Sequence, residues 1–373
     1  MKKTFITMIA AVVSVMAVTS CGGGAEGPAD EVMSKKAYTQ AVAKYDDISD
    51  FSSGLARVRI GNYYSGQYGY INKKGKEVTE VKYVIASSTF HDGLAYAYRD
   101  GKYGYINTKG KEVIDFKFIS AHDFSDGAAL VKTEKGYGYI NTKGEIISAT
   151  DYSDAGDGFH EGLTWVYKDG NYGYINNKGE VVIAMTFKDA YNFSEGAALV
   201  ETKSGYGYIN KKGELITAAE YDDGHDYSDG FAIVYKGDKI HALNNKGQIE
   251  FTFPNGILPA EKFHDGMIVV CDTDNMKFGY INKKGEIAIP CKYDAADSFR
   301  NGKALTVIVK GYDEDEEEYE AIYSIIDTDG DVVENLTESD AEDYESVDED
   351  FDDMLYVITE GESLRSSLED LFW

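Results

Sequence analysis

The stretch YGYIN at residues 103–107, followed by Gly110, decides the fold of this chain. The five-residue motif returns at regular distances, and with its degenerate forms it occurs eight times. The copies start at Tyr68, Tyr103, Tyr137, Tyr172, Tyr206, Ile240, Phe278 and Tyr323. Self-similarity at a fixed period indicates a repeat architecture. The motif therefore predicts a fold, but by itself it names no activity.

One repeat, residues 90–123, predicts a small antiparallel meander. Residues 94–98 alternate as in a strand, and Asp100-Gly101 is a strong hairpin signal because glycine accepts a positive φ. Residues 103–107 form the second strand, and a turn at 108–110 places Gly110 in the left-handed region. The third strand is expected at 111–116. The residues that lead to the next turn can add a short fourth strand.

The two faces of the middle strand predict how the repeats associate. Tyr103 and Tyr105 point to one face, whereas Gly104 and Ile106 point to the other. Neither face is polar, so both are expected to be covered by neighbouring repeats. The space beside Gly104 is expected to hold an aromatic ring from the adjacent repeat.

The turn before each first strand carries a repeated glycine, at Gly54, Gly93, Gly127, Gly162, Gly196, Gly230, Gly266 and Gly302, with spacings of 34 to 39 residues. Units this small cohere only as a stack. The predicted fold class is all-β, with about eight short meanders in tandem. A β-propeller-like ring is favoured over an open β-solenoid.

The site residues that the repeats suggest are structural ones. They are the aromatic and glycine at the start of six nearly identical motifs: Tyr68, Gly69, Tyr103, Gly104, Tyr137, Gly138, Tyr172, Gly173, Tyr206, Gly207, Phe278 and Gly279.

The N-terminus predicts export. Lys2 and Lys3 precede an apolar run at residues 5–18, and Cys21 follows a small-residue cleavage site. This arrangement resembles the bacterial lipoprotein signal, which implies removal of residues 1–20 and a lipid on Cys21. Residues 21–36 are then expected to form a flexible tether. Ordinary secretion with an incidental cysteine is the alternative.

The charge of the chain is uneven. The formal net charge is −28, and residues 311–353 contain 21 Asp and Glu without any Lys or Arg. Residues 1–310 contain 40 Asp and Glu against 36 Lys and Arg and are therefore near neutral. The repeats are assigned to residues 37–335, and residues 336–373 form an acidic tail. This tail can add an edge strand at residues 354–359, and a C-terminal helix at 363–373 can cap the array or present itself to a partner. No basic face suited to nucleic acid is present.

Residues 101–114 and the preceding Phe-x-Asp-Gly turn resemble the WG repeat of bacterial envelope and secreted proteins. The resemblance covers residues 45 to about 333, with Tyr or Phe where the family carries Trp, and with Pro290 as the only remaining proline after a third strand. It implies an all-β repeat module without an established enzymatic site. A weaker likeness to the aromatic-glycine repeats of cell-wall-binding proteins suggests glycan or envelope contact.

Several residue patterns could in principle bind a metal or catalyse a reaction. The six histidines are expected in solvated loops rather than in a shared metal site: His91, His122, His160, His225, His241 and His264. The repeated turn acids are expected to shape turns rather than to catalyse: Asp92, Asp126, Glu161, Glu195, Asp229 and Asp265. Residues 327–331 followed by Glu338 have a calcium-loop-like spacing, but a turn in a degenerate eighth repeat explains them better.

Cys271 and Cys291 are expected to be free thiols. A complete strand lies between them, so their Cα atoms are two strand spacings apart, which is more than the distance of about 7 Å that a disulfide tolerates.

These patterns together predict a non-enzymatic binding or scaffolding module. It is expected to need no cofactor or metal and to be lipid-anchored in the bacterial envelope, at the outer membrane or cell surface rather than the inner membrane. The partner is an unknown protein or glycan, not nucleic acid. A glycan-processing enzyme and a purely structural spacer remain the alternatives.

Overall fold

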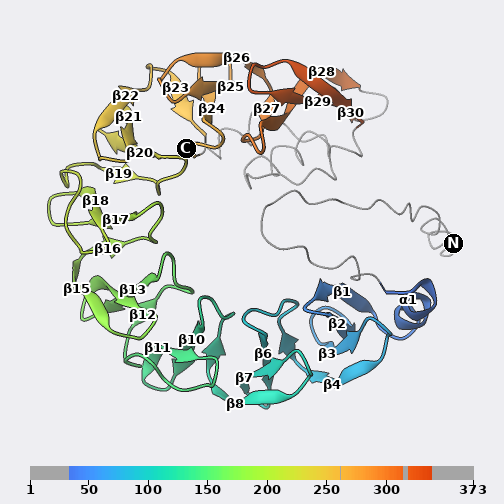
Figure 1. Cartoon of the computed structure of the whole chain (residues 1–373). Helices are drawn as coiled ribbons and strands as arrows, with labels where there is room; N and C mark the ends of the chain where they lie inside the picture. Colours follow the sequence, from blue (N-terminus) through green and yellow to red (C-terminus); the bar gives the residue numbers. More distant parts are fainter. Residues whose placement is uncertain (1–32, 261, 314–317, 338–373) are drawn as a thin grey trace.

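The computed structural model describes residues 33–260, 262–313 and 318–337. Within them the chain forms eight antiparallel sheets that follow one another along the sequence, numbered here sheets 1 to 8. Figure 1 shows the sheets placed around an arc, from sheet 1 in blue to sheet 8 in red. The predicted all-β tandem array of eight meanders is confirmed. None of the described helices is long and apolar enough to cross a membrane.

The strands of sheets 1 to 4 are β1 (Asp47–Ser52), β2 (Leu55–Ile60), β3 (Gln67–Asn72) and β4 (Glu77–Tyr83); β5 (Ile85–Ala86), β6 (Leu94–Arg99), β7 (Lys102–Asn107) and β8 (Glu112–Phe118); β9 (Ser120–Ala121), β10 (Ala128–Thr133) and β11 (Gly136–Asn141); and β12 (Asp154–Ala155), β13 (Leu163–Lys168), β14 (Asn171–Asn176) and β15 (Val181–Phe187). The strands of sheets 5 to 8 are β16 (Asp189–Ala190), β17 (Ala197–Glu201) and β18 (Tyr206–Asn210); β19 (Asp223–Gly224), β20 (Phe231–Lys236), β21 (Lys239–Asn244) and β22 (Ile249–Thr252); β23 (Ile257–Pro259), β24 (Met267–Asp272), β25 (Lys277–Asn282) and β26 (Ile287–Tyr293); and β27 (Ala295–Ala296), β28 (Lys303–Asp313), β29 (Glu318–Asp327) and β30 (Val332–Leu336).

In sheets 2 to 8 a short first strand of two or three residues precedes the long strands of the meander, whereas sheet 1 begins with the six-residue β1. The short strand β9 pairs with β10, so it belongs to the sheet that follows it and not to the sheet of β8. Sheets 3 and 5 contain three strands, and isolated bridges such as Tyr137 with Tyr152 replace the fourth. The short fourth strand that the sequence suggested therefore links successive repeats.

The sheets are arranged as in a propeller. The last long strand of a sheet, such as β8 or β26, lies on the outer side of the arc in Figure 1, and the short strand is at the opposite edge of the same sheet. Sheets 1 and 8 lie at the two ends of the arc. Within the described residues no strand pairing joins them.

Sheet 1 is covered by a helix that the sequence analysis did not predict. Helix α1 (Lys35–Val42) is capped by Ser34, whose hydroxyl accepts a hydrogen bond from the Ala37 amide. Ala37 and Ala41 pack with Val58 and Ile71 of sheet 1 in one buried cluster. The helix thus caps the first repeat, as terminal elements of repeat arrays commonly do.

The predicted turn chemistry is present. Asp100 and Gly101 both have positive φ, 52° and 81°, as a type I′ hairpin turn requires. Gly110 has a φ of 72°, in the left-handed region that the sequence predicted. The Asn107 side-chain oxygen shapes this second turn, because it accepts hydrogen bonds from the amides of Lys109 and Lys111.

Successive sheets cohere by burying tyrosine against isoleucine. Tyr70 of sheet 1 packs with Ile106 of sheet 2, and Tyr105 of sheet 2 packs with Ile140 of sheet 3. All four side chains have no exposed surface. The prediction that both faces of a sheet are covered by neighbouring repeats is confirmed for these sheets, and the core runs through the stack as a series of such clusters.

The expectation about the space beside Gly104 was wrong in one respect. A methyl group at this position would lie 2.6 Å from the ring of Phe116 and 2.7 Å from the Ile114 carbonyl oxygen. Both residues belong to β8 of the same sheet, not to the adjacent repeat. The register between β7 and β8 shifts here, so β8 bulges into the volume that glycine leaves.

Candidate binding surface

The repeated turn acids have a structural role. In sheet 2, Asp92 and Gly93 have φ values of 51° and 76°, and His91 and Leu94 exchange backbone hydrogen bonds at 2.9 Å. This is a two-residue type I′ turn. The carboxylate of Asp92 reaches the next sheet, where it accepts a hydrogen bond from the Gly127 amide at 2.8 Å.

The same turn-to-turn hydrogen bond recurs along the array at 2.5 to 3.1 Å, in the pairs Glu161 with Gly196, Glu195 with Gly230, Asp229 with Gly266, and Asp265 with Gly302. Within the described residues Asp126 makes no such bond. Because these bonds link turn to turn, all these turns lie on one side of the arc, which we name the acid-turn end. Their carboxylates stabilise the stack.

The two tyrosines of each motif differ in burial. The second one has no exposed surface in six repeats: Tyr70, Tyr105, Tyr139, Tyr174, Tyr208 and Tyr280. Each donates its hydroxyl proton to a carbonyl oxygen 17 residues later, in the first segment of the next sheet, as Tyr105 does to His122 at 2.7 Å. Burial raises the pKa of five of these phenols, those of Tyr70, Tyr105, Tyr139, Tyr174 and Tyr208. The second tyrosine is thus the core residue of the repeat.

The first tyrosine of the motif is only half-buried. This holds for Tyr68, Tyr103, Tyr137, Tyr172 and Tyr206, whereas Phe278 is fully buried. The twelve predicted structural residues therefore fall into two groups. The six glycines and Phe278 lie in the core, whereas the five tyrosines retain exposed surface. These tyrosines stand beside the hairpin turn between the two long central strands, opposite the acid-turn end. We name this side the tyrosine end.

Additional aromatic side chains accompany the first tyrosines. In sheet 2 the ring of Tyr103 lies 4.7 Å from that of Tyr98, measured between centroids, and 6.2 Å from that of Tyr96. In sheet 4 the ring of Tyr172 lies 4.6 Å from Tyr167 and 5.6 Å from Trp165. All of these rings are half-buried. The tyrosine end therefore offers clusters of partly exposed rings on more than one sheet.

Sheet 1 carries the most exposed aromatics of the tyrosine end. Its central hairpin is extended, and the exposed fractions of Tyr63 and Tyr64 in it are 77% and 95%. The Arg57 guanidinium lies over the ring of Tyr68 in the same sheet, 4.9 Å from its centroid. Tyr63 and Tyr64 were not among the predicted site residues. The available signal was the first spacing of 39 residues, the longest between turn glycines.

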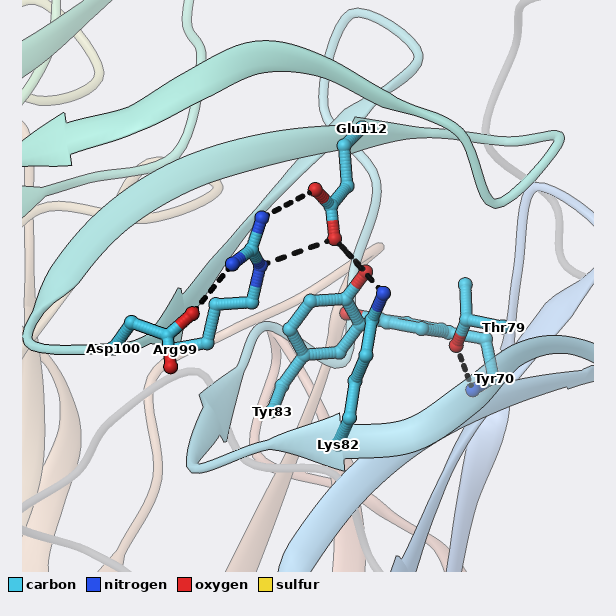
Figure 2. A network of polar contacts seen from close by, with 7 residues as sticks. All are labelled: Tyr70, Thr79, Lys82, Tyr83, Arg99, Asp100 and Glu112. Carbon is cyan, nitrogen blue, oxygen red and sulfur yellow. Dashed lines mark hydrogen bonds and ion pairs between the residues drawn. The ribbon is translucent and has the colours of Figure 1, made fainter.

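An ionic network joins sheets 1 and 2 (Figure 2). Arg99 donates two hydrogen bonds to the Glu112 carboxylate, at 3.2 and 2.7 Å, and its remaining nitrogen contacts Asp100 at 2.5 Å. From sheet 1, Lys82 Nζ lies 3.1 Å from Glu112, and the Tyr83 hydroxyl donates to the same carboxylate at 3.2 Å. Glu112 thus receives three partners from two sheets.

The network shifts the pKa values of Glu112 and Tyr83. The hydrogen bonds from Arg99, with further ones from Lys82, lower the pKa of Glu112 to about 2. Burial and the neighbouring carboxylate raise the pKa of Tyr83, which is fully buried and stacks on Phe116. Bidentate, partly buried pairs of this kind are the stronger class of ion pair. Their placement between two sheets favours a stabilising role over a catalytic one.

Two carboxylates depart from the repeat consensus. Asp123 in sheet 3 and Asp226 in sheet 6 stand before the turn aromatic, and burial raises the pKa of both carboxyl groups. Asp123 lies 4.0 Å from the His91 ring nitrogen, and Asp226 lies 3.8 Å from Lys262 Nζ. Sheets 4 and 5 separate them, so they do not face each other across one glycosidic bond, which requires about 5 to 9.5 Å.

The histidines are spread over several sheets. His91 lies 3.0 Å from the Thr89 hydroxyl, His225 lies 3.2 Å from the Tyr235 hydroxyl, and His241 lies 2.8 Å from the Thr252 hydroxyl. Burial lowers the pKa of His225, His241 and His264. Within the described ranges no group of three or more His, Cys, Asp or Glu side chains could hold a metal ion.

The remaining candidates have structural explanations. Cys271 and Cys291 are free, as predicted, and burial raises the pKa of the Cys271 thiol to about 12. The Asp327 carboxylate accepts hydrogen bonds from the amides of Asp329 and Asp331, the same turn that Asn107 makes in sheet 2. Cys21, Glu338 and the segments at 354–359 and 363–373 lie outside the described residues.

Comparisons with known proteins agree with this architecture. The WG-containing repeat matches at residues 43–64, 68–103, 103–136, 137–172, 172–204, 206–239 and 278–308, which is more than half of the chain. No curated protein sequence matches.

Among solved structures, a eukaryotic initiation factor shares 11% identity over 76% of this chain and 85% of its own, with a TM-score of 0.44. A quinoprotein alcohol dehydrogenase-like protein from Bacteroides thetaiotaomicron shares 13% identity over 76% of this chain and 81% of its own, with a TM-score of 0.28. Likeness this distant carries no argument about activity. The repeat matches do identify the family, and the chain belongs to the WG-containing repeat proteins.

Proposed function

We propose that this protein is a non-catalytic binding scaffold, anchored by a lipid on Cys21 in the bacterial envelope, whose repeats use Tyr or Phe in place of Trp. The observation that carries the proposal is the contrast between the two ends of the sheets. The recurrent carboxylates are hydrogen-bonded to the next repeat, whereas aromatic rings at the opposite end remain partly exposed.

The exposed rings support binding because folding does not need them in that position. Burying a large apolar side chain stabilises a protein by about 1.5 to 3 kcal/mol. Tyr63 and Tyr64 contribute little of this, since most of each ring is in solvent. Exposed aromatic clusters on a folded domain commonly mark interaction sites. A purely structural spacer would have no use for such rings.

The anchoring part of the proposal rests on the sequence of the first 21 residues, which lie outside the described structure. The test is membrane fractionation of cells that produce the full chain or its Cys21→Ser variant. The wild type should fractionate with the envelope and incorporate labelled fatty acid. The variant should do neither. A variant that remains membrane-bound and labelled would contradict the lipid anchor.

The binding role is tested by affinity capture from envelope extracts beside a glycan array, with the mature chain as bait. We expect at least one saturable protein or glycan ligand with a defined Kd. Failure to bind any ligand in both assays would remove the proposal and leave the structural spacer.

The enzymatic alternative has one observation in its favour, the raised pKa of two carboxyl groups that the repeats do not share. It is tested separately by incubating captured glycans with the wild type and with the Asp123→Asn and Asp226→Asn variants. Release of shorter glycans by the wild type alone would replace the scaffold by a hydrolase. Unchanged glycans in all samples are the outcome that the proposal expects.

A further inference from the structure

The central hairpin loop of sheet 1 is longer than those of sheets 2 to 7. In sheet 2 strand β6 ends at Arg99 and β7 begins at Lys102, so the turn has two residues. In sheet 1 strand β2 ends at Ile60 and β3 begins at Gln67, which leaves a six-residue loop, Gly-Asn-Tyr-Tyr-Ser-Gly. We name residues 61–66 the sheet 1 loop. It projects from the tyrosine end.

The sheet 1 loop is held in one conformation by its own polar groups. The Asn62 side-chain oxygen accepts hydrogen bonds from the amides of Tyr64 and Ser65 and from the Ser65 hydroxyl, each at 3.0 Å. The Gly61 amide donates to Asp46 at 2.8 Å, and the Gly66 amide donates to the Asn62 carbonyl oxygen at 2.8 Å. A preorganised loop loses little conformational entropy on binding.

The base of the loop requires glycine. Gly61 has a φ of 102°, and a methyl group there would lie 2.9 Å from the Gly66 Cα atom. A methyl group on Gly66 would lie 2.7 Å from the Asn62 carbonyl oxygen. The two glycines thus let the loop strands approach closely, so that the intervening residues are lifted away from the sheet.

Two tyrosine rings stand at the tip of this loop. The centroids of Tyr63 and Tyr64 are 5.5 Å apart and their planes meet at 89°. The Arg59 guanidinium lies 6.0 Å from the Tyr63 centroid. One ring therefore offers an open face while the other borders it, and each carries a hydroxyl group that can donate or accept a hydrogen bond.

The partly exposed rings continue along the arc. The first motif tyrosine is half-buried in each of sheets 1 to 5, and sheets 2 and 4 add the clusters around Tyr103 and Tyr172. The series ends in sheets 7 and 8, where Phe278 and Tyr323 are buried. Because the rings recur once per sheet, they suit a ligand that also repeats, with a similar face presented at intervals.

The charge of the protein narrows the class of such a ligand. A repeating ligand could be a nucleic acid, an acidic polysaccharide or a neutral polysaccharide. Residues 1–310, which include sheets 1 to 5, contain 40 Asp and Glu against 36 Lys and Arg, so they offer no excess of positive charge to attract a polyanion. A neutral sugar ring presents polarised C–H groups on its face, which are attracted by the negative face of an aromatic ring. Its hydroxyl groups can pair with the phenol hydroxyls.

We propose that the tyrosine end of sheets 1 to 5 binds a neutral polysaccharide, with the rings of Tyr63 and Tyr64 as its principal stacking site. This inference rests on the proposed binding function and specifies its ligand and its surface. Tyr103, Tyr172 and their neighbouring rings extend the contact along the chain of the polymer. Asn62 and Ser65 hydrogen-bond within the loop and hold its shape. The groups that the loop offers to the ligand are therefore the rings and hydroxyl groups of Tyr63 and Tyr64.

The test is affinity electrophoresis of the mature full-length chain in native gels that contain starch, xylan, mannan or mixed-linkage β-glucan, with alginate as the acidic comparison. At least one neutral polymer should retard the wild type, and alginate should not. The double variant Tyr63→Ala/Tyr64→Ala should bind at least tenfold more weakly. Tyr103→Ala should bind about threefold more weakly.

The matched control is Tyr38→Ala, because Tyr38 is 54% exposed but lies on α1. It should bind as the wild type does. Circular dichroism and Tm must show that the double variant is folded, as expected for side chains that are mostly in solvent.

The inference falls if no neutral polymer retards the wild type, if alginate retards it equally, or if the double variant binds unchanged. A protein ligand captured from the envelope in that case would leave the proposed scaffold function standing. Absence of both protein and glycan ligands would remove the two together.

Discussion

The acid-turn end and the tyrosine end of the sheets have different roles. At the acid-turn end the same turn recurs, and its carboxylate is hydrogen-bonded to the glycine amide of the next sheet in five places. At the tyrosine end the loops and ring partners vary from sheet to sheet, from a two-residue turn beside Tyr103 to the projecting loop that carries Tyr63 and Tyr64. The turns that recur unchanged make hydrogen bonds between sheets, whereas the loops that vary carry exposed side chains.

The comparison teaches how residues of a repeat protein can be assigned to structure or to binding. A residue that makes the same contact with the next repeat in sheet after sheet serves the stack. A residue that makes no such contact and keeps exposed surface, as Tyr63 and Tyr64 do, can serve binding. On this criterion the turn acids belong to the fold, in agreement with the expectation that they shape turns.

The largest expected effect on stability concerns the two tyrosines of strand β7. Tyr105→Ala removes a fully buried ring and its hydrogen bond to His122, and should lower the free energy of unfolding by about 3 to 5 kcal/mol. Tyr103→Ala removes a half-buried ring from the tyrosine end and should cost about 1 kcal/mol. Urea unfolding monitored by circular dichroism measures both. Equal losses would contradict the assignment of the two tyrosines to different roles.

A second test concerns the acid-turn end. Asp92→Ala removes the acceptor of the Gly127 amide and should destabilise the protein by about 1 to 2 kcal/mol. Asp126→Ala is the matched control, because Asp126 has the same φ of 51° but makes no such bond within the described residues. The difference between the two variants isolates the hydrogen bond from the backbone cost. If both variants lose the same stability, the carboxylates do not link the repeats.

The smallest expected effect is the pH dependence of the network around Glu112. Its pKa in the folded protein is about 2, below the ordinary value of 4.5, so folding favours the ionised carboxylate. The resulting stability is complete above pH 4.5 and is lost as the pH falls toward 2. Because the side chain retains 29% exposure, the loss should be about 1 kcal/mol.

This effect is measured by comparing urea unfolding of the wild type and of Glu112→Gln between pH 6 and pH 2. The advantage of the wild type should shrink over the acidic part of this range. An advantage that stays constant down to pH 2 would show that the ion network contributes nothing through the charge of Glu112.

What the sequence alone determined is the local part of the structure. Alternation of side chains predicted the long strands, and Asp100-Gly101 and Gly110 predicted their turns, since positive φ values are a property of the residues themselves. The regular spacing predicted that the units stack. The free thiols of Cys271 and Cys291 followed from the same strand order. None of these predictions required knowledge of how one sheet lies on the next.

Only the tertiary structure decided the contacts between elements. It buried Tyr105 but left Tyr103 half-exposed, placed Phe116 beside Gly104, joined Asp92 to Gly127, and covered sheet 1 with α1. These outcomes depend on the distance and rotation between successive sheets, which no short window of sequence specifies. Two tyrosines on one face of one strand look alike in the sequence, and the neighbouring sheet determines which of them solvent can reach.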